Sequence, residues 1–225
     1  MLIRENTCTA IVGPSGSGKS TIASLLLSLY PVNPSTTLPG GFSGKISLGG
    51  IEIRRIHVPT LRQLVAVVPQ HSTLFPKSIR ENITYGLEGS SPLNATTNVH
   101  HAARAAGIHE FISSLPLGYD TVVGDGGLGL SGGQVQRIAI ARALVRQPRV
   151  LILDEATSNL DGESAAVIGR TIKNLIAGGN HMTVIIITHK KEMMEVADRV
   201  VVMDRGRVVE DGKPSDLGGR ALLRL

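Results

Sequence analysis

A glycine-rich loop near the N-terminus constrains the fold of this 225-residue chain more than any other feature. The loop, Gly13-Pro-Ser-Gly-Ser-Gly-Lys-Ser20, follows the β-prone run Thr9 to Val12 and precedes the apolar helical pattern Lys19 to Leu29. Glycines suit such a tight connection, because they adopt positive φ angles at little steric cost. The sequence therefore predicts a buried strand, a tight loop and a buried helix, which we expect Pro31 to terminate.

Three more apolar, β-prone runs end in polar residues: Leu64 to Val68, Val150 to Leu153 and Thr183 to Ile187. Short continuous apolar runs of this kind indicate parallel strands that are buried on both faces. Helical patterns alternate with them, and this alternation predicts an α/β fold with a mainly parallel sheet and right-handed crossovers. Near the C-terminus, Val200 to Met203 and Arg207 to Val209 flank a short turn, which predicts a small hairpin.

The middle of the chain is rich in helix-forming residues and has no strong strand run before Val150. Ser78-x-x-Glu81 has the form of a capping box, and Asp161 can cap a later helix that ends at Gly178. We predict one domain over residues 1–225, with an α/β core of residues 1–70 and 147–225 and an inserted helical subdomain of residues 71–146. Residues 31–44, rich in Pro, Gly, Ser and Thr, are expected to form an exposed loop.

Composition excludes several classes of protein. Apolar residues make up 42% and charged residues 18% of the chain, which is typical of a globular domain and not of a disordered chain. Three Tyr, three Phe and no Trp leave little material for base stacking, and the basic residues are scattered, so we expect no nucleic-acid partner. The single cysteine, Cys8, excludes an internal disulfide and favours a reducing, intracellular setting, and no apolar run is long enough to span a membrane.

The glycine-rich loop fits the spacing G-x-x-x-x-G-K-[ST], whose phosphate chemistry is explicit. Its backbone N–H groups can curl around phosphate oxygens, Lys19 can neutralise the terminal phosphates, and Ser20 can ligate Mg²⁺. A turn with a chance lysine is the competing interpretation, and the flanking strand and helix patterns disfavour it. A purine nucleotide with Mg²⁺ is therefore the expected ligand, bound by Gly13, Ser15, Gly16, Ser17, Gly18, Lys19, Ser20 and Thr21.

Polar residues follow the other predicted strands, at the sheet edge where open α/β sheets bind ligands. Asp154 and Glu155 come directly after a buried run; an Asp there can hold the Mg²⁺ shell, and the adjacent Glu can polarise an attacking water. His189 also follows a strand end, which favours a role in the site over an ordinary surface position. Gln70 follows the run that ends at Val68, and its position alone is uninformative.

A second potential anion site lies at Leu130-Ser-Gly-Gly-Gln134, before another helical pattern. One nucleotide does not easily explain two such helix starts. The sequence LSGGQ resembles the signature of the nucleotide-binding domains of ABC ATPases. Other motifs of that family match in order: Gly13 to Thr21 is similar to Walker A, Gln70 to the Q-loop, Val150 to Glu155 to Walker B, Ser158 to Asp161 to the D-loop, and His189 to the switch histidine.

This resemblance spans nearly the whole chain and implies a P-loop NTPase core with an inserted helical subdomain. It also implies ATP and Mg²⁺ as cofactors and a head-to-tail dimer, in which ATP lies between Walker A of one cassette and the signature of a second, identical or different cassette. The residues that would contact ATP across the dimer are Ser131, Gly132, Gly133 and Gln134. The other implied roles are general base for Glu155, γ-phosphate contact for His189, Mg²⁺ contacts for Ser20, Gln70 and Asp154, and the dimer interface for Asp161.

Residues 72–83 and 118–125 are similar to B-type ABC exporters, in which these regions contact the transmembrane domain. The resemblance implies an ATPase that drives export from the cytoplasmic face of a membrane and contacts its transmembrane partner through Gln70 to Ile83 and Thr121 to Asp125. Asp125 stands where that family usually has Glu, and Asn159 replaces the usual Ala of the D-loop. Neither departure removes a catalytic group.

The N-terminus departs further from the family. Its cassettes begin with extra strands and an aromatic residue that stacks on adenine, but no aromatic residue precedes Gly13. We expect a chain that begins inside its domain as part of a longer transporter, with ATP affinity lowered about ten- to a hundredfold if nothing replaces the stack. Two alternatives stay open: a soluble ABC ATPase of repair or translation, and a truncated nucleotide-binding module without turnover.

Overall fold

A six-stranded sheet forms the centre of the α/β part of the molecule. The computed structural model describes residues 1–33, 42–124, 127–158, 160–178 and 181–217. In the order in which they pair, the strands are β12 (Arg207–Gly212), β11 (Arg199–Asp204), β1 (Cys8–Val12), β10 (Thr183–Ile187), β9 (Val150–Asp154) and β6 (Val65–Val68). All neighbours run parallel except β11 and β12, which form an antiparallel hairpin. The predicted mainly parallel α/β sheet and C-terminal hairpin are confirmed.

The register of the parallel strands brings their carboxyl ends to one edge of the sheet. Ile11 in β1 pairs with Ile187 in β10, which pairs in turn with Asp154 in β9. On the far side of β9, Val68 in β6 pairs with Leu153. The loops that follow β1, β6, β9 and β10 therefore start side by side.

Eight α-helices occur in the described part of the chain, together with short 3-10 turns. The helices are α1 (Lys19–Leu26), α2 (Val58–Leu64), α3 (Ile79–Ile83), α4 (Thr96–Ala105), α5 (His109–Ser114), α6 (Gly132–Leu144), α7 (Gly162–Ala177) and α8 (Lys191–Met194). Six two-residue strands pair outside the main sheet: β2 (Val32–Asn33) with β3 (Phe42–Ser43), β4 (Ser47–Leu48) with β5 (Ile51–Glu52), and β7 (Lys77–Ser78) with β8 (Val122–Val123).

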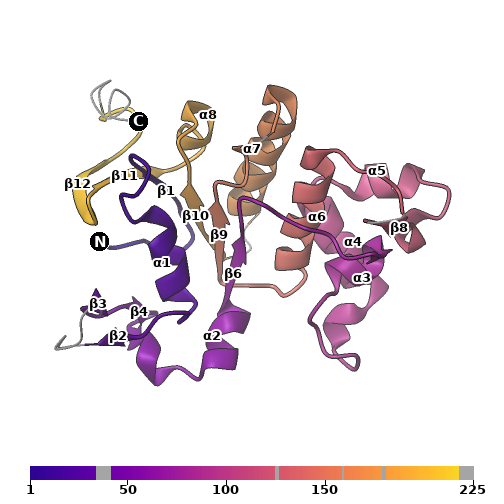
Figure 1. Cartoon of the computed structure of the whole chain (residues 1–225), viewed down its shortest axis with the longest axis horizontal. Helices are drawn as coiled ribbons and strands as arrows, with labels where there is room; N and C mark the ends of the chain where they lie inside the picture. Colours follow the sequence, from indigo (N-terminus) through magenta and orange to yellow (C-terminus); the bar gives the residue numbers. More distant parts are fainter. Residues whose placement is uncertain (34–41, 125–126, 159, 179–180, 218–225) are drawn as a thin grey trace.

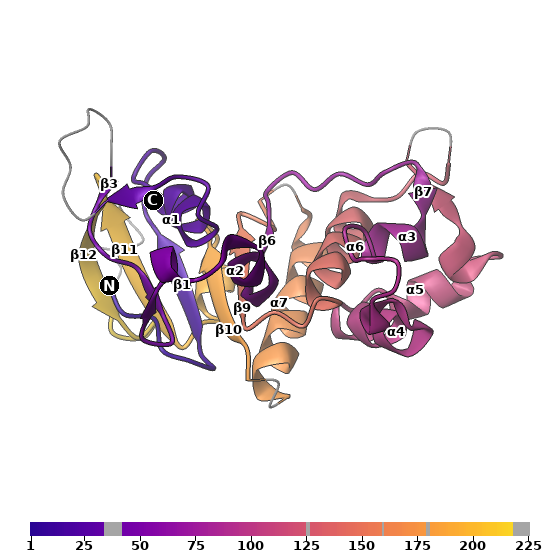
Figure 2. The same ribbon diagram turned by 90° about the horizontal axis from the view of Figure 1, so that it is seen from below.

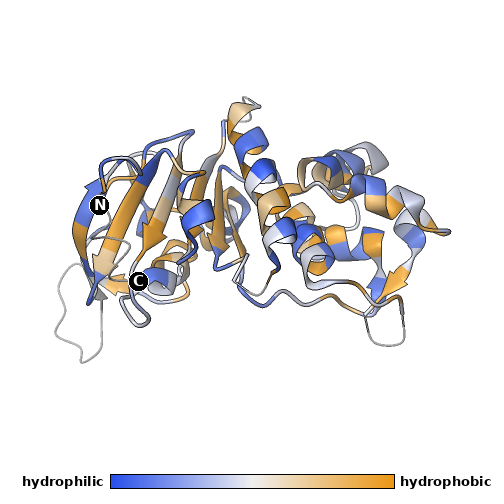
Figure 3. Ribbon diagram, turned by 90° about the horizontal axis from the view of Figure 1, so that it is seen from above, coloured by the Kyte–Doolittle hydropathy of each residue, from blue (hydrophilic) through white to orange (hydrophobic). Residues whose placement is uncertain are grey.

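The elements form an elongated molecule with the sheet toward one end and α3, α4 and α5 at the other (Figure 1, Figure 2). Helix α7 contacts β10 of the sheet and both α4 and α6, so it joins the two ends. The helices show hydrophilic and hydrophobic residues along their length, as expected for helices with one face on a core (Figure 3).

Successive residues of each central strand pack into different hydrophobic clusters on the two faces of the sheet. In β9, Leu151 and Leu153 belong to the cluster that continues into the helices α4 and α6, whereas Ile152 belongs to the cluster around Ala23 and Leu61. This alternation follows from the two-residue period of a strand. It explains why these strands are mostly apolar on both faces, since both faces are covered.

Several sequence predictions of local structure are confirmed and others are wrong. Ser78 forms the predicted capping box at α3, and Asp161 caps α7 as predicted by accepting a hydrogen bond from the Ser164 amide at 2.8 Å. Ser131 forms a second reciprocal capping box, at α6, which was not predicted. The predicted helix Lys19 to Leu29 ends at Leu26, and Pro31 does not terminate it, because Ser28 adopts a left-handed conformation at φ 51°.

One further boundary differs from the prediction, and short pairs of strands occur where none was predicted. Leu64 ends α2 and does not begin the following strand, because its carbonyl accepts the Arg149 amide at 2.8 Å while strand pairing starts at Val65. The helix-rich middle of the chain also contains a short antiparallel pair of strands, β7 and β8. Each has two residues, and they pair Lys77 with Val123 and Ser78 with Val122, which are far apart in the sequence. In the predicted loop 31–44, β2 pairs with β3, and residues 34–41 lie outside the described residues.

A membrane-spanning helix is absent from the residues that the structure describes, since none of their helices combines the necessary length and hydropathy.

Because the core covers both faces of the sheet, we expect truncation of a buried isoleucine to lower the free energy of unfolding much more than truncation of an exposed one. Ile152 is completely buried in β9, whereas the side chain of Ile51 in β5 is 55% exposed. We expect Ile152→Ala to lower the free energy of unfolding by about 2 to 5 kcal/mol, and Ile51→Ala to lower it by less than about 1 kcal/mol. Equilibrium urea unfolding measures both; equal losses would contradict this description of the core.

Candidate nucleotide-binding site

The glycine-rich loop connects β1 to α1 and is held against the turn between β11 and β12. Gly13 has a φ of 148°, and a Cβ atom there would lie 2.1 Å from the Met203 carbonyl oxygen, so only glycine fits. Gly18 enters α1 at φ 95°. The Gly206 amide donates to the Ser17 carbonyl at 3.0 Å. The loop is therefore fixed in shape by its own glycines and by the hairpin beside it.

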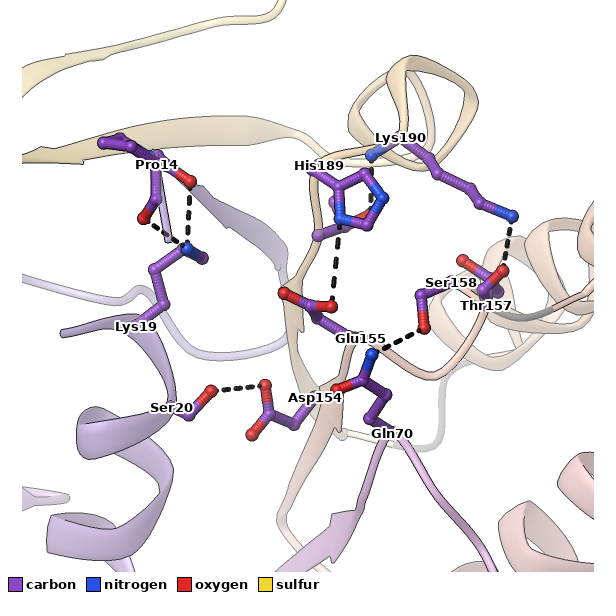
Figure 4. A network of polar contacts seen from close by, with 12 residues as sticks. Pro14, Lys19, Ser20, Gln70, Asp154, Glu155, Thr157, Ser158, His189 and Lys190 are labelled. Atoms are coloured by element: carbon purple, nitrogen blue, oxygen red, sulfur yellow. Dashed lines mark hydrogen bonds and ion pairs between the residues drawn. The ribbon is translucent and has the colours of Figure 1, made fainter. Parts of the chain in front are cut away.

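Lys19 lies across this loop with little exposure to solvent. Its side chain is 7% exposed, and the Nζ atom donates to the carbonyl oxygens of Gly13 and Pro14, both at 2.9 Å (Figure 4). An ammonium group has three protons, so one remains for an anion.

Two polar groups at the start of α1 also lack a protein partner. The buried Ser17 hydroxyl has no hydrogen-bond partner among the described residues. At the N-terminus of α1, no side chain caps the helix and its first turn holds no acidic residue. The N–H groups of Gly18 to Thr21 and the ammonium of Lys19 therefore fit the phosphate groups of a nucleotide.

Ser20 and Asp154 bring two oxygen ligands together at the foot of the loop. The Ser20 hydroxyl donates to Asp154 Oδ1 at 3.0 Å. Burial raises the pKa of the Asp154 carboxyl above its ordinary value, and the Ser20 hydrogen bond opposes part of that rise. A divalent cation beside this carboxylate would compensate for its burial. No group of three or more His, Cys, Asp or Glu side chains that could hold a metal ion occurs in the described ranges, so Mg²⁺ here would also need phosphate, water or amide oxygens as ligands.

Glu155 and His189 face each other just beyond the sheet edge, one residue after the end of β9 and two residues after the end of β10. His189 Nδ1 lies 3.8 Å from Glu155 Oε2, and Figure 4 shows both side chains above Asp154. Glu155 has a φ of 50°, which is unusual for a residue other than glycine, and its amide donates to the Ile187 carbonyl at 2.8 Å. This conformation turns the Glu155 carboxylate toward His189.

Gln70 lies at the same edge, after β6. Its Nε2 atom donates to Ser158 Oγ at 3.1 Å, and Gln136 in α6 donates to the preceding Pro69 carbonyl at 3.3 Å. Figure 4 places the Gln70 side chain beside Asp154 and Glu155. The structure thus brings together all of the predicted residues from β1, β6, β9 and β10, which are Lys19, Ser20, Gln70, Asp154, Glu155 and His189.

The predicted signature residues lie elsewhere. Ser131 Oγ accepts the Gln134 amide at 3.3 Å, and the Gln134 side chain accepts the Ser131 amide at 2.9 Å. Gly133 packs against α7, because a Cβ there would lie 2.6 Å from Ser164 Oγ. Helices α1 and α6 stand on opposite sides of β6 and β9 in two views (Figure 1, Figure 2). The structure therefore does not bring the signature to the glycine-rich loop of the same chain.

Asp161, the last residue of the predicted D-loop, caps α7. The hydrogen bond from the Ser164 amide lowers the pKa of the Asp161 carboxyl, which is exposed. Asn159 and Asp125, singled out as departures from the family pattern, lie outside the described residues.

Sequence reasoning missed Lys190. It interprets this residue as half of a scattered basic pair, but its Nζ atom donates to the backbone carbonyls of Thr157 and Leu160 (Figure 4). Its place directly after His189 is the one sequence signal that could have indicated a role near the site.

Comparisons with known proteins agree with this geometry. A sequence profile of the family described as ABC transporter matches residues 1–158. The mitochondrial ATP-binding cassette sub-family B member 10 of Mus musculus is 45% identical over 215 residues, and the ATP-dependent lipid A-core flippase of Acinetobacter baylyi is 44% identical over 218 residues. Each alignment covers 96% of this chain, but only 28% and 35% of those two proteins.

A solved structure is similar over the same length. The structure of a bacterial Atm1-family ABC exporter with ATP bound has a TM-score of 0.80 and 41% identity, and covers 96% of this chain and 35% of that chain. The chain thus spans about a third or less of these relatives. The profile match, the identities and the shared fold show that this chain belongs to the ABC transporter family, as an ATP-binding domain similar to those of B-type exporters.

Proposed function

We propose that this chain hydrolyses ATP and drives export of a substrate through a transmembrane partner. The observation that supports this most directly is the convergence of Lys19, Ser20, Asp154, Glu155 and His189 at one sheet edge. A phosphate site, a metal position and a carboxylate beside a histidine are the parts that phosphoryl transfer to water requires. Names of relatives that include a flippase and a secretion protein support the link to export.

Each residue of the site has a role in this proposal. The phosphates of ATP occupy the loop formed by Gly13, Ser15, Gly16, Ser17, Gly18, Lys19, Ser20 and Thr21. Ser20, Asp154 and Gln70 would hold Mg²⁺, which would supply positive charge against the phosphates of ATP. Lys19 stabilises the same charge from the loop, while its bonds to two carbonyls hold its ammonium in place.

Glu155 is the proposed general base. It accepts a proton from the water that attacks the γ-phosphorus, as the bond from that phosphorus to the β–γ bridging oxygen breaks. His189 lies close enough to Glu155 to orient it and contacts the γ-phosphate. Gln70, held by Ser158 in this structure, reaches the same water and Mg²⁺.

A second cassette is needed because the signature is separated from the loop. The capped N-terminus of α6, with Ser131, Gly132, Gly133 and Gln134, then contacts ATP held by the partner cassette, and Asp161 lies in the interface. Ser131 and Gly132 are exposed on this chain, which leaves them accessible to such a partner.

The transmembrane partner contacts the helical end in this proposal. Residues 1–70 and 147–225 form the α/β core, and residues 71–146 form the helical subdomain. The contact regions at a cytoplasmic membrane face are Gln70 to Ile83, which begins at the last residue of this part of the core, and Thr121 to Asp125 in the helical subdomain. The exposed side chain of Val122 lies in this region. The alternatives of a soluble repair or translation ATPase and of a module without turnover are disfavoured by the exporter relatives and by the intact catalytic residues.

Removing the proposed base should trap the ATP-bound dimer. Glu155→Gln keeps the shape of the side chain but cannot accept the proton, so we expect hydrolysis to fall at least about a hundredfold. Light scattering with MgATP should show dimers, which Lys19→Ala should not form. Glu163→Gln, an exposed change in the first turn of α7, serves as the matched control and should hydrolyse ATP like the unaltered chain. If the protein stays a monomer at saturating ATP, and calorimetry confirms that ATP is bound, the dimer proposal for this chain is contradicted.

The role of Asp154 predicts a specific defect in Mg²⁺ use. Asp154→Asn removes the buried carboxylate, so we expect the Mg²⁺ concentration for half-maximal hydrolysis to rise about ten- to a hundredfold. Asp216→Asn, an exposed change near the end of the described chain, should leave it unchanged. Titration of Mg²⁺ at fixed ATP measures both, and equal Mg²⁺ requirements in the two variants would show that Asp154 does not hold the metal.

A further inference from the structure

The side chain of Lys190, the residue after His189, forms hydrogen bonds to the backbone that follows Glu155. Its Nζ atom donates to the carbonyl oxygens of Thr157 at 2.5 Å and Leu160 at 3.1 Å. Its own backbone is fixed, because its amide donates to Thr188 Oγ1 at 3.0 Å and its carbonyl accepts the Met193 amide at 3.2 Å. The Lys190 side chain is partly buried, so this contact is not an ordinary solvated surface charge.

The segment that Lys190 holds connects two parts of the proposed reaction. At one end, the Ser158 amide donates to the Glu155 carbonyl at 3.0 Å, and the Leu160 amide donates to the Thr157 carbonyl at 3.2 Å. At the other end, the Leu160 side chain lies 3.4 Å from the position of a Cβ atom at Gly132. Thr157 and Leu160 thus lie between Glu155 and the signature, and Lys190 contacts both.

We propose that Lys190 is a positioning residue, which holds Thr157 and Leu160 in place between the catalytic pair Glu155–His189 and the signature Gly132. This inference rests on the proposed function, since it assigns Lys190 a part in the same ATPase reaction. Hydrogen bonds from a charged donor are stronger than neutral ones, so the two bonds from Lys190 hold these carbonyls more firmly than neutral donors would. Lys190 itself does not touch the reacting atoms.

The neighbouring residue provides a matched control. Lys191 has the same charge and length, but its Nζ atom is exposed and lies 4.0 Å from Glu195 on the same helix turn. Both variants lose one positive charge, but the carbonyls of Thr157 and Leu160 lose a donor only in Lys190→Met, whereas Lys191→Met loses an exposed contact with Glu195. Lys190→Arg keeps a cation that can donate to both carbonyls.

The first experiment needs no catalysis. Hydrogen exchange of the nucleotide-free protein should show the Ser158 and Leu160 amides exchanging about tenfold faster or more in Lys190→Met than in Lys191→Met, because the segment loses charged hydrogen bonds. The Ile152 amide, in the core, should exchange alike in both. Equal exchange at Ser158 and Leu160 would overturn the proposal, whether or not the chain hydrolyses ATP.

The second experiment measures steady-state hydrolysis of ATP. We expect Lys190→Met to lower kcat about tenfold with KM changed less than about twofold, Lys190→Arg to recover most of kcat, and Lys191→Met to match the unaltered chain. A kcat equal to that of Lys191→Met, or a loss that Lys190→Arg does not recover, would overturn the positioning role. Absence of hydrolysis in the unaltered chain would instead refute the proposed function, and the exchange experiment would still decide whether Lys190 holds the segment.

Discussion

The parallel register of β1, β10, β9 and β6 is the constraint on which the site depends. Because Ile11, Ile187 and Asp154 lie level across three strands, the loops that follow them begin at one edge. A slip of one residue in any of these pairings would turn that strand's side chains to the opposite face and break the alternation between the two cores. The burial of both faces therefore fixes the same register that brings residues distant in sequence together.

Two backbone positions at this edge adopt conformations that most residues avoid. Gly13 approaches the Met203 carbonyl so closely that no side chain fits, and Glu155 adopts a positive φ with its amide held by Ile187. Such conformations persist where the surroundings over-determine them, and they are frequent at functional sites. Here the rigid sheet stabilises both, and the result is a closed phosphate loop beside a carboxylate directed at a histidine.

The sequence was most informative where local patterns and core burial agree. The run Thr183 to Ile187 matches β10 at both ends, and the predicted caps at Ser78 and Asp161 follow from side-chain chemistry three residues apart. The predicted end of α1 was wrong because the left-handed conformation of Ser28 has no recognisable pattern in the sequence. The β7–β8 pair and the contacts of Lys190 were missed because they join segments that only the tertiary fold brings together.

We propose that a complete ATP site needs two cassettes, because α1 and α6 stand on opposite sides of β6 and β9 (Figure 1). An experimental structure of the Glu155→Gln protein with MgATP tests it most directly. We predict a head-to-tail dimer in which the γ-phosphate lies between Lys19 of one cassette and Ser131 of the other. ATP enclosed by the glycine-rich loop of a single chain, with Ser131 far from every phosphate, would contradict it.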